Sequence, residues 1–397
     1  MLLDSRLNKP IPTEELQRRW KATRAAMKER GIDVLVMQAN NDFMGGYIKW
    51  FTDIPATQGY TEILTFPADD GMTMISQGPD DLDQRVPEQG DGVRRGIARI
   101  MTAPMYASAG FTHLYDADLT IKALAPFKDG CIGLVGLSTL SSHLVDSLRK
   151  QFSGAEFVDA SDLVDCIKAV KSPIEIEVIR GVAHMQDEAM KAAFDAFEPG
   201  KLDRDITAAA EYKSLRMGSE QGLYMCASSP IGTPQFFRNR HFQNRQVQPG
   251  DQMAILIENS GAGGYYCEIG RTATLGRATD EMHKELDFVL QARAFMLERL
   301  RPGASAPDIW KEYNDFMDSH GKPKEDRLHC HSMGYDMVER PLIRIDEPMK
   351  LEANMVVSCH PTYANENGMH WLCDNYLIGA NATERLHAYP EEITEIL

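Results

Sequence analysis

Positive charge is in short supply in this sequence. Its 42 lysine and arginine residues stand against 58 aspartate and glutamate residues, which leaves a net charge of −16 with histidine neutral. Proteins that bind nucleic acids or anionic membranes need a basic surface, so neither partner is expected. No run of 18 apolar residues is present to span a membrane. Hydrophobic residues still make up 43% of the chain, which is enough for folded cores and excludes a disordered protein.

Paired cysteines are lacking as well. The seven cysteines are odd in number and scattered, and no two of them form a Cys-X-X-Cys motif. This excludes a disulfide framework and fits a reducing compartment better. The first residues contain Asp4 and Pro10 and no apolar stretch, so no secretory signal is predicted. We therefore expect a cytoplasmic protein.

Signals for helices and strands alternate over residues 1–160. A helix is expected to begin with Thr13 as N-cap and to stop at Gly31, which stands where a C-terminal cap glycine is usual. The apolar run 32–38 is typical of a buried strand. Residues 61–77 indicate two strands around a turn at Asp70 and Gly71. The pattern predicts an α/β domain.

A second pattern begins near residue 170. Ser172 and Pro173 suit the start of a long amphipathic helix that runs to about residue 197. Further helices are expected at 204–217, 280–300 and 305–320, and strands at 341–345, 354–359 and 372–378. This half is therefore α+β. We predict two domains, an α/β domain over 1–165 and an α+β domain over 166–397.

Seven segments resemble, in order, landmarks of the creatinase/prolidase/methionine aminopeptidase family, whose catalytic domain has the pita-bread fold. They are Lys171-Ser172 followed by EIEVIR, QPGD (248–251), GGYYCEIGRT (263–272), RPGAS (301–305), HSMGYDMVERP (331–341), LEANMVVSCHP (351–361) and CDNYLI (373–378). The resemblance implies an N-terminal α/β domain of the creatinase and prolidase branch, a pita-bread C-terminal domain, and a homodimer.

The metal-dependent members of this family hold two ions with two Asp, one His and two Glu. At or beside the corresponding positions this chain has Glu258 (one residue out of register), Glu268, His331, His360 and Cys373, with Asp374 next to the cysteine. Only His331 matches in type, and Glu268 is one methylene longer than the expected Asp. Loss of the bridging carboxylates disfavours a site with two metal ions.

Two hypotheses remain for this site. In the first, which the resemblance to creatinase favours, no cofactor is bound, and Glu258, Glu268, His331 and His360 act as proton-transfer groups. In the second, Glu268, His331 and His360, with Glu258 or Asp374, hold a single divalent ion, because two imidazoles and a carboxylate are a recognised mononuclear set.

Other segments supply candidate groups for catalysis and substrate binding. His241, upstream of the QPGD turn, is a candidate general acid or base. Arg238 and Arg240 lie beside it and suit a substrate carboxylate. The resemblance also places Tyr47, Trp50 and Phe51 in a loop that can form an apolar wall or a cation–π cage. Tyr265 and Glu339, from two of the matched motifs, complete the substrate-binding candidates.

These observations lead to three hypotheses about function. The first is a non-peptidase hydrolase, similar to creatinase, that cleaves a C–N bond in a small, polar, nitrogen-containing metabolite by acid–base catalysis. The alternative is a mononuclear metal enzyme, either an amide hydrolase similar to Xaa-Pro peptidases or a lyase. The third is a catalytically inactive family member that binds a partner.

Overall fold

The computed structural model describes residues 10–41, 43, 45–56, 59–87, 92–112, 114–233, 236–365 and 368–397. The chain divides into two compact units, Met1–Lys168 and Ala169–Leu397, and each is described by itself. In the part of the chain that the structure describes, the helices are all too short or too polar to cross a membrane.

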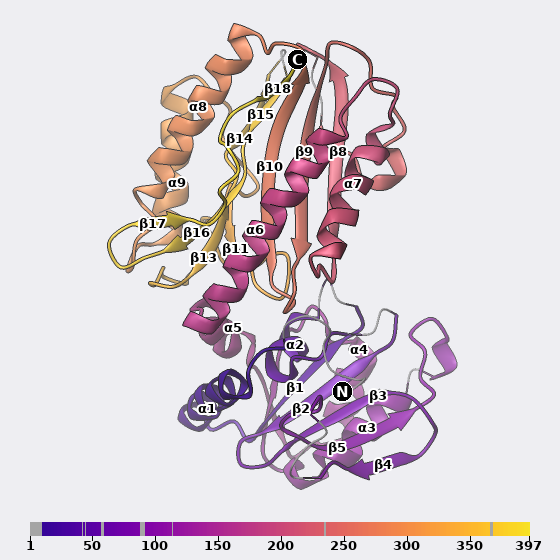
Figure 1. Ribbon diagram of the computed structural model, residues 1–397. Helices are drawn as coiled ribbons and strands as arrows, with labels where there is room; N and C mark the ends of the chain where they lie inside the picture. The colour runs from indigo at the N-terminus through magenta and orange to yellow at the C-terminus, as the bar shows by residue number, and fades with distance from the viewer. Residues whose placement is uncertain are drawn as a thin grey trace. The chain divides into compact units, whose positions relative to one another are not determined.

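The first unit is an α/β layer structure around a seven-stranded mixed sheet (Figure 1). The strands run in the order β4-β5-β3-β2-β1-β6-β7, with β1, β6 and β7 parallel and β1, β2 and β3 antiparallel. The elements are α1 (Thr13–Arg30), β1 (Val34–Ala39), α2 (Gly46–Thr52), β2 (Glu62–Pro67), β3 (Met72–Gln77), β4 (Leu82–Arg85), β5 (Ile97–Ala103), α3 (Tyr115–Leu124), β6 (Cys131–Leu134), α4 (Ser142–Gln151), β7 (Glu156–Asp159) and α5 (Ser161–Ala169).

Several local predictions for this unit are confirmed. Gly31 ends α1 in the left-handed conformation, with φ of 67°. The residues on either side of the Asp70–Gly71 turn form the antiparallel pair β2–β3. One detail was wrong: the N-cap of α1 is Pro12, not Thr13, and it makes no side-chain capping bond. The φ of Pro12 is −56°, which lies within the narrow range that the proline ring allows.

The second unit combines two helix pairs with two main sheets. One sheet has the order β18-β10-β9-β8 and the other the order β12-β11-β13-β16-β17, and a short β14–β15 ribbon stands apart. The elements are α6 (Pro173–Asp195), α7 (Asp203–Arg216), β8 (Gln221–Pro230), β9 (Asp251–Ser260), β10 (Tyr266–Leu275), α8 (Asp280–Leu297), α9 (Ala306–Ser319), β11 (Cys330–Ser332), β12 (Glu339–Leu342), β13 (Val356–Cys359), β14 (Thr362–Asn365), β15 (Gly368–Trp371), β16 (Asp374–Ile378), β17 (Thr383–Arg385) and β18 (Thr394–Ile396).

Each helix pair covers one sheet. Helices α6 and α7 pack on one face of β8, β9 and β10, and α8 and α9 lie side by side against the sheet that contains β11, β13 and β16 (Figure 1). The start of α6 is fixed as the sequence predicts, because Ser172 and Glu175 form a reciprocal capping box and Pro173 is the first helical residue. The free face of β9 and β10 is thereby left to meet the second sheet.

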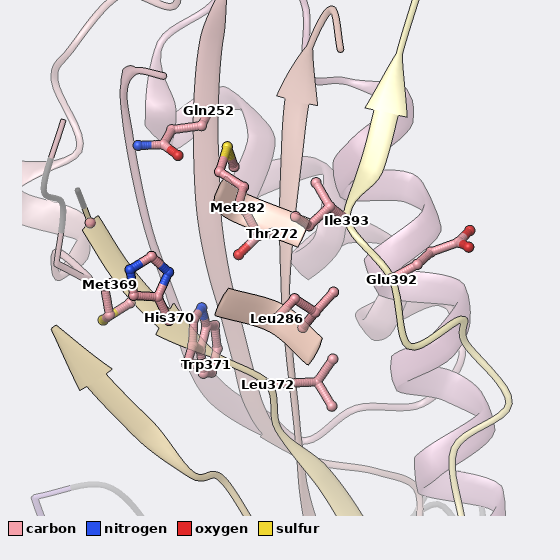
Figure 2. Close-up of a pocket in the computed structure, with 11 residues that line it drawn as sticks. Gln252, Thr272, Met282, Leu286, Met369, His370, Trp371, Leu372, Glu392 and Ile393 are labelled. Carbon is pink, nitrogen blue, oxygen red and sulfur yellow. The ribbon is translucent and has the colours of Figure 1, made fainter. Parts of the chain in front are cut away.

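A cavity of about 30 Å³ lies between β10, β15, α8 and the C-terminal segment (Figure 2). Its lining includes Thr272, Leu286, His370 and Trp371. This volume has room for a water molecule but not for a substrate. Gly270 is needed beside it, since a Cβ atom at this position would lie 1.8 Å from the Trp371 ring.

Candidate active site

Two rows of side chains cross the sheet formed by β11, β13 and β16. Cys330, Cys359 and Asp374 stand opposite one another in one row, and His331, Ser358 and Asn375 form the next row. Because side chains alternate between the two faces of a sheet, these rows point in opposite directions. The two cysteines belong to the core under α8 and α9. The His331 row therefore faces the other way.

All three members of the His331 row contact Glu268 of β10. The Nε2 atom of His331 lies 3.5 Å from the carboxylate, and the Ser358 hydroxyl donates a hydrogen bond to it at 2.9 Å. The Asn375 side-chain oxygen accepts the backbone N–H of Glu268 at 2.7 Å. The His331 row of the sheet formed by β11, β13 and β16 thus positions the Glu268 carboxylate of the sheet that contains β10.

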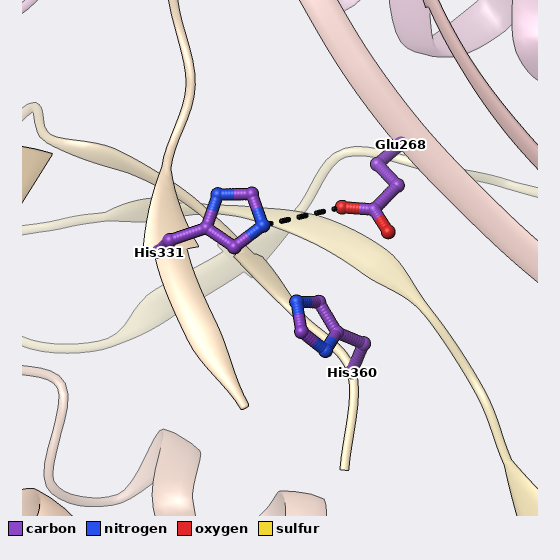
Figure 3. Close-up of side chains that lie close together, drawn as sticks. All are labelled: Glu268, His331 and His360. Atoms are coloured by element: carbon purple, nitrogen blue, oxygen red, sulfur yellow. Dashed lines mark ion pairs between the residues drawn. The ribbon is translucent and has the colours of Figure 1, made fainter. Parts of the chain in front are cut away.

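His360 completes the group from the end of β13 (Figure 3). The His331 and His360 rings are 5.2 Å apart. One donor atom from each of Glu268, His331 and His360 lies within 4.8 Å of the other two, and all three residues are buried. Sequence analysis proposed these three residues, and the structure brings them together.

The charge states of this group follow from its surroundings. Burial opposes ionisation of Glu268, but the imidazoles of His360 and His331 and the Ser358 hydroxyl hold the pKa of its carboxyl group at about 2. Burial lowers the pKa of His360 to about 4. The carboxylate is therefore ionised and the His360 ring neutral at pH 7, which are the forms in which both side chains bind cations.

Glu258 of β9 stands directly opposite Glu268 in the antiparallel β9–β10 pair. Residues paired in this way share a face of the sheet. Burial and the negative charge of Glu268 raise the pKa of Glu258 well above its usual value. Arg271 pairs with Asp374 and Arg245 pairs with Asp251, so neither of these arginines neutralises Glu258.

The donor set of Glu268, His331 and His360 fits one divalent ion. In the described part of the chain it is the one group of three such side chains whose donor atoms converge. The Nδ1 atom of His331 lies 3.0 Å from the Ser332 carbonyl, so an N–H at Nδ1 donates to that carbonyl, and Nε2 is the ring nitrogen that faces Glu268 and would meet an ion. A hydrogen bond from the second ring nitrogen is the usual support of a metal-binding histidine.

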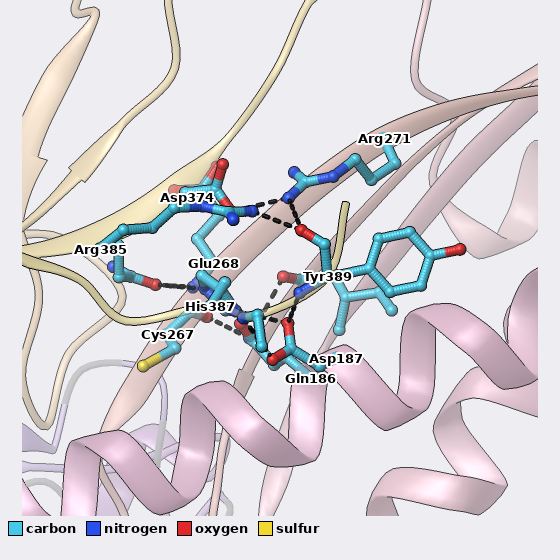
Figure 4. A network of polar contacts seen from close by, with 12 residues as sticks. Gln186, Asp187, Cys267, Glu268, Arg271, Asp374, Arg385, His387 and Tyr389 are labelled. Carbon is cyan, nitrogen blue, oxygen red and sulfur yellow. Dashed lines mark hydrogen bonds and ion pairs between the residues drawn. The ribbon is translucent and has the colours of Figure 1, made fainter. Parts of the chain in front are cut away.

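Asp374 does not join this group, and the suggestion that it could bind a metal is corrected. Its carboxylate accepts hydrogen bonds from Arg271 at 2.8 Å and Arg385 at 3.0 Å (Figure 4). It accepts a third from Arg293 at 2.8 Å. Although burial works against it, the Arg271 charge and those of its neighbours hold the pKa of Asp374 below its usual value. It lies in the cysteine row, and so on the face turned away from Glu268.

The loop that was expected to supply the general base and an arginine clamp is exposed. His241 lies in a single exposed turn, Arg240–Phe242, and the structure shows no contact between it and Glu268, His331 or His360. Arg240 forms an ion pair with Glu211 of α7, and the exposed Arg238 acts electrostatically on Asp203. The structure does not bring these residues into the group.

The aromatic residues of the first unit do not form an open wall. Trp50 and Phe51 are buried, with their rings 5.0 Å apart. Tyr47 is half-buried, donates a hydrogen bond to Asp165 at 2.8 Å and lies under the Lys168 ammonium group. These contacts are all internal to the first unit.

Tyr265 and Glu339 are also engaged elsewhere. The buried Tyr265 donates a hydrogen bond to Glu175, at the start of α6, over 2.5 Å. Glu339 lies 3.5 Å from the ammonium group of Lys171, and both side chains are buried. Their role in substrate binding stays a prediction. Ser358 and Asn375, by contrast, were missed, although period-2 spacing along β13 and β16 could have found them.

Comparison with known proteins agrees with this architecture. The pattern of metallopeptidase family M24 matches residues 177–380, which is just over half of the chain. The chain belongs to this family. The M24 relatives include the Xaa-Pro dipeptidase of Pyrococcus furiosus, 24% identical over 66% of this chain and 75% of that protein. The uncharacterized hydrolase/peptidase y4tM of Sinorhizobium fredii is 26% identical over 79% of each chain.

Solved structures extend the M24 similarity to the whole fold. The X-Pro aminopeptidase of Thermotoga maritima superposes with a TM-score of 0.78 at 18% identity, covering 95% of this chain and 99% of that one. The prolidase of Pyrococcus horikoshii gives 0.75 at 19% identity, with the same coverage. The predicted fold, an α/β domain followed by a pita-bread domain, is confirmed.

The Asp374 cluster yields a stability prediction. Asp374→Asn leaves the buried guanidinium group of Arg271 without a counter-charge and leaves Arg293 with only the partly exposed Glu391, so the free energy of unfolding should fall by about 3–5 kcal/mol. Urea denaturation followed by circular dichroism measures this. Glu384→Gln, which breaks an exposed pair with Arg180, is the matched control and should cost less than about 1 kcal/mol. If the two substitutions lower the free energy of unfolding equally, Asp374 does not act as the counter-charge of the buried arginines.

A second prediction concerns the raised pKa of Glu258. A carboxyl group whose pKa rises on folding destabilises the native state above its unfolded pKa of about 4.3, because unfolding then releases a proton. Glu258→Gln cannot titrate. It should therefore become more stable relative to the parent as the pH rises above about 5, by up to about 1.4 kcal/mol per pH unit, until the pH passes the folded pKa of Glu258.

Urea denaturation with a chelator present, at each pH, tests this dependence. The same substitution at the exposed Glu352 is the control and should show no trend. If the difference in free energy of unfolding between Glu258→Gln and the parent does not change with pH, Glu258 is ionised in the folded protein.

Proposed function

We propose that this M24 protein is a mononuclear metal-dependent hydrolase that cleaves the C–N bond of a small amide or dipeptide. The observation that carries the proposal is the buried convergence of Glu268, His331 and His360. The M24 relatives named Xaa-Pro dipeptidase favour an amide bond as the target. This was the alternative hypothesis from the sequence, and it now takes precedence over the metal-free reading.

The three donors match what one divalent ion requires. Two imidazole nitrogens and one carboxylate leave room for further ligands from water or substrate. When bound, the ion supplies a Lewis acid beside the scissile carbonyl group. The five-ligand set of a two-metal site is not complete here, because the Asp374 carboxylate is taken by arginines and Cys373 is a thiol with a pKa raised well above its usual value by burial.

The residues around the ion site have two further roles, which are positioning of the ligands and proton transfer. Ser358 and Asn375 hold Glu268 in place, and the Ser332 carbonyl orients His331. Glu258 is buried on the same face as Glu268 and is assigned the proton transfer to the departing nitrogen. In the balanced reaction, water adds OH to the acyl carbon and H to the nitrogen as the C–N bond breaks.

A metal-free hydrolase remains the second candidate. One observation favours it: His331 and Glu268 are already 3.5 Å apart, so they can act as an acid–base pair without an ion between them. In that case the group would activate water by proton transfer alone, as expected for a creatinase-like enzyme.

Metal analysis separates the two candidates. After dialysis against Mn²⁺, Co²⁺ or Zn²⁺, the purified chain should contain about one ion, while His331→Ala and Glu268→Gln should lose it. Hydrolysis of Xaa-Pro dipeptides should fall by more than about 100-fold in both variants. Replacing a residue that only supports a metal ligand already lowers metal affinity or activity by about 10–100-fold, and loss of the ligand itself should cost more. Elemental mass spectrometry and a released-proline assay provide the two readouts.

His184→Ala, on the exposed side of α6, is the control and should keep both ion and activity. Full activity after exhaustive chelation would reject the metal-dependent reading in favour of the metal-free one. If neither dipeptides nor other small amides are hydrolysed with any of the three ions, the proposed function fails altogether.

A further inference from the structure

Side chains hold both edges of the peptide group between Cys267 and Glu268. Gln186 of α6 donates a hydrogen bond to the Cys267 carbonyl at 2.5 Å. On the other edge, the Glu268 N–H donates to the side-chain oxygen of Asn375 at 2.7 Å. The Cα–Cβ bond of Glu268 starts next to this plane, so fixing the plane restricts the direction in which the carboxylate points.

His387 holds Asn375 in turn. Its Nε2 atom lies 3.2 Å from the same Asn375 oxygen that accepts the Glu268 N–H, and the Asn375 amide nitrogen donates to the Met333 sulfur at 3.3 Å. The Nδ1 atom of His387 lies 3.2 Å from the Asp187 carboxylate (Figure 4). The buried His387 ring thus joins the C-terminal segment to α6 and to β16.

Both ring nitrogens of His387 face hydrogen-bond acceptors. The Asn375 oxygen cannot turn away, because it already accepts the Glu268 N–H. A ring with a proton on each nitrogen satisfies both contacts, and the Asp187 carboxylate supplies its counter-charge. Asp187 is fixed for this role by the backbone N–H of Ala388, which donates to it at 2.7 Å. Although burial opposes it, the His387 ring and backbone N–H groups hold the pKa of Asp187 below its usual value.

We infer that His387 and Asp187 are positioning residues that hold the Glu268 carboxylate in place through Asn375. The inference rests on the proposed function, in which Glu268 is the carboxylate donor of the ion site. Because Gln186 and Asp187 are adjacent in α6, one turn of this helix supports both edges of the Glu268 peptide group. Support of this kind, one hydrogen bond beyond a metal ligand, sets the orientation of the ligand.

Ion binding tests this role in the assembled site. Titration calorimetry with Mn²⁺ compares the parent with His387→Leu and His387→Gln. His387→Leu should weaken Mn²⁺ binding by about 10–100-fold, as loss of a residue that supports a metal ligand usually does. His387→Gln should recover part of the loss, because its amide can still donate to Asn375. His143→Leu is the matched control, since His143 also lies 3.2 Å from a carboxylate, that of Asp116 in the first unit, and it should bind Mn²⁺ as the parent does.

Amide hydrogen exchange tests the positioning without any ion or substrate. In the metal-free chain, NMR follows the N–H of Glu268 and that of Ile255 in the same sheet. His387→Leu should speed exchange at Glu268 by at least about 10-fold and leave Ile255 unchanged, because only the hydrogen bond to Asn375 is loosened. Asp187→Asn should act in the same direction, and the double variant should do no more than His387→Leu alone, because both residues act through one chain of contacts.

The outcomes separate this inference from the proposed function. If the parent binds no ion and hydrolyses no amide, while His387→Leu speeds exchange at Glu268 alone, the proposed function fails and the positioning role stands. Equal acceleration at Glu268 and Ile255, which a merely structural role would give, or no acceleration at Glu268, overturns the inference. Where the parent binds Mn²⁺, an unchanged affinity in His387→Leu overturns it as well.

Discussion

The buried carboxylate of Asp374 needs positive charge around it, and this need organises the second unit. Three arginines from β10, α8 and β17 converge on one side chain of β16. Breaking such a cluster leaves uncompensated charge in a low-dielectric interior, which is far more costly than losing an exposed pair. The cluster therefore ties both sheets and a covering helix together next to the site. Asn375, which holds the backbone of Glu268, directly follows Asp374.

The same constraint shapes the active site in a different way. Glu258 and Glu268 are opposed across β9 and β10, and two buried negative charges at that separation would repel strongly. Glu268 keeps its charge because imidazoles and a hydroxyl face it, while Glu258 has no comparable support and holds its proton. Two chemically identical side chains thus have pKa values shifted in opposite directions by their neighbours alone.

The fold and the candidate residues of the central group were predicted because seven segments resemble, in order, the landmarks of a known family. His331, Glu268 and His360 stand in motifs whose order is characteristic, and Ser172 with Pro173 marks the start of α6. Asp374 could not be placed in this way. It adjoins Cys373 in the sequence, yet strand alternation and the two distant arginines Arg271 and Arg293 decide that it faces away from the histidines. No motif records pairing between residues about 80–110 positions apart.

The basic run at residues 238–245 shows why local charge in a sequence is a weak guide to substrate binding. Residues 238–245 look basic, but Arg240 and Arg245 are neutralised by Glu211 and Asp251 once the chain folds. Whether an arginine is left to meet a substrate depends on its partners in the folded chain, and neighbouring residues in the sequence do not record those partners. The basic run therefore gives no sign of the substrate's charge, and neither does the net charge of −16.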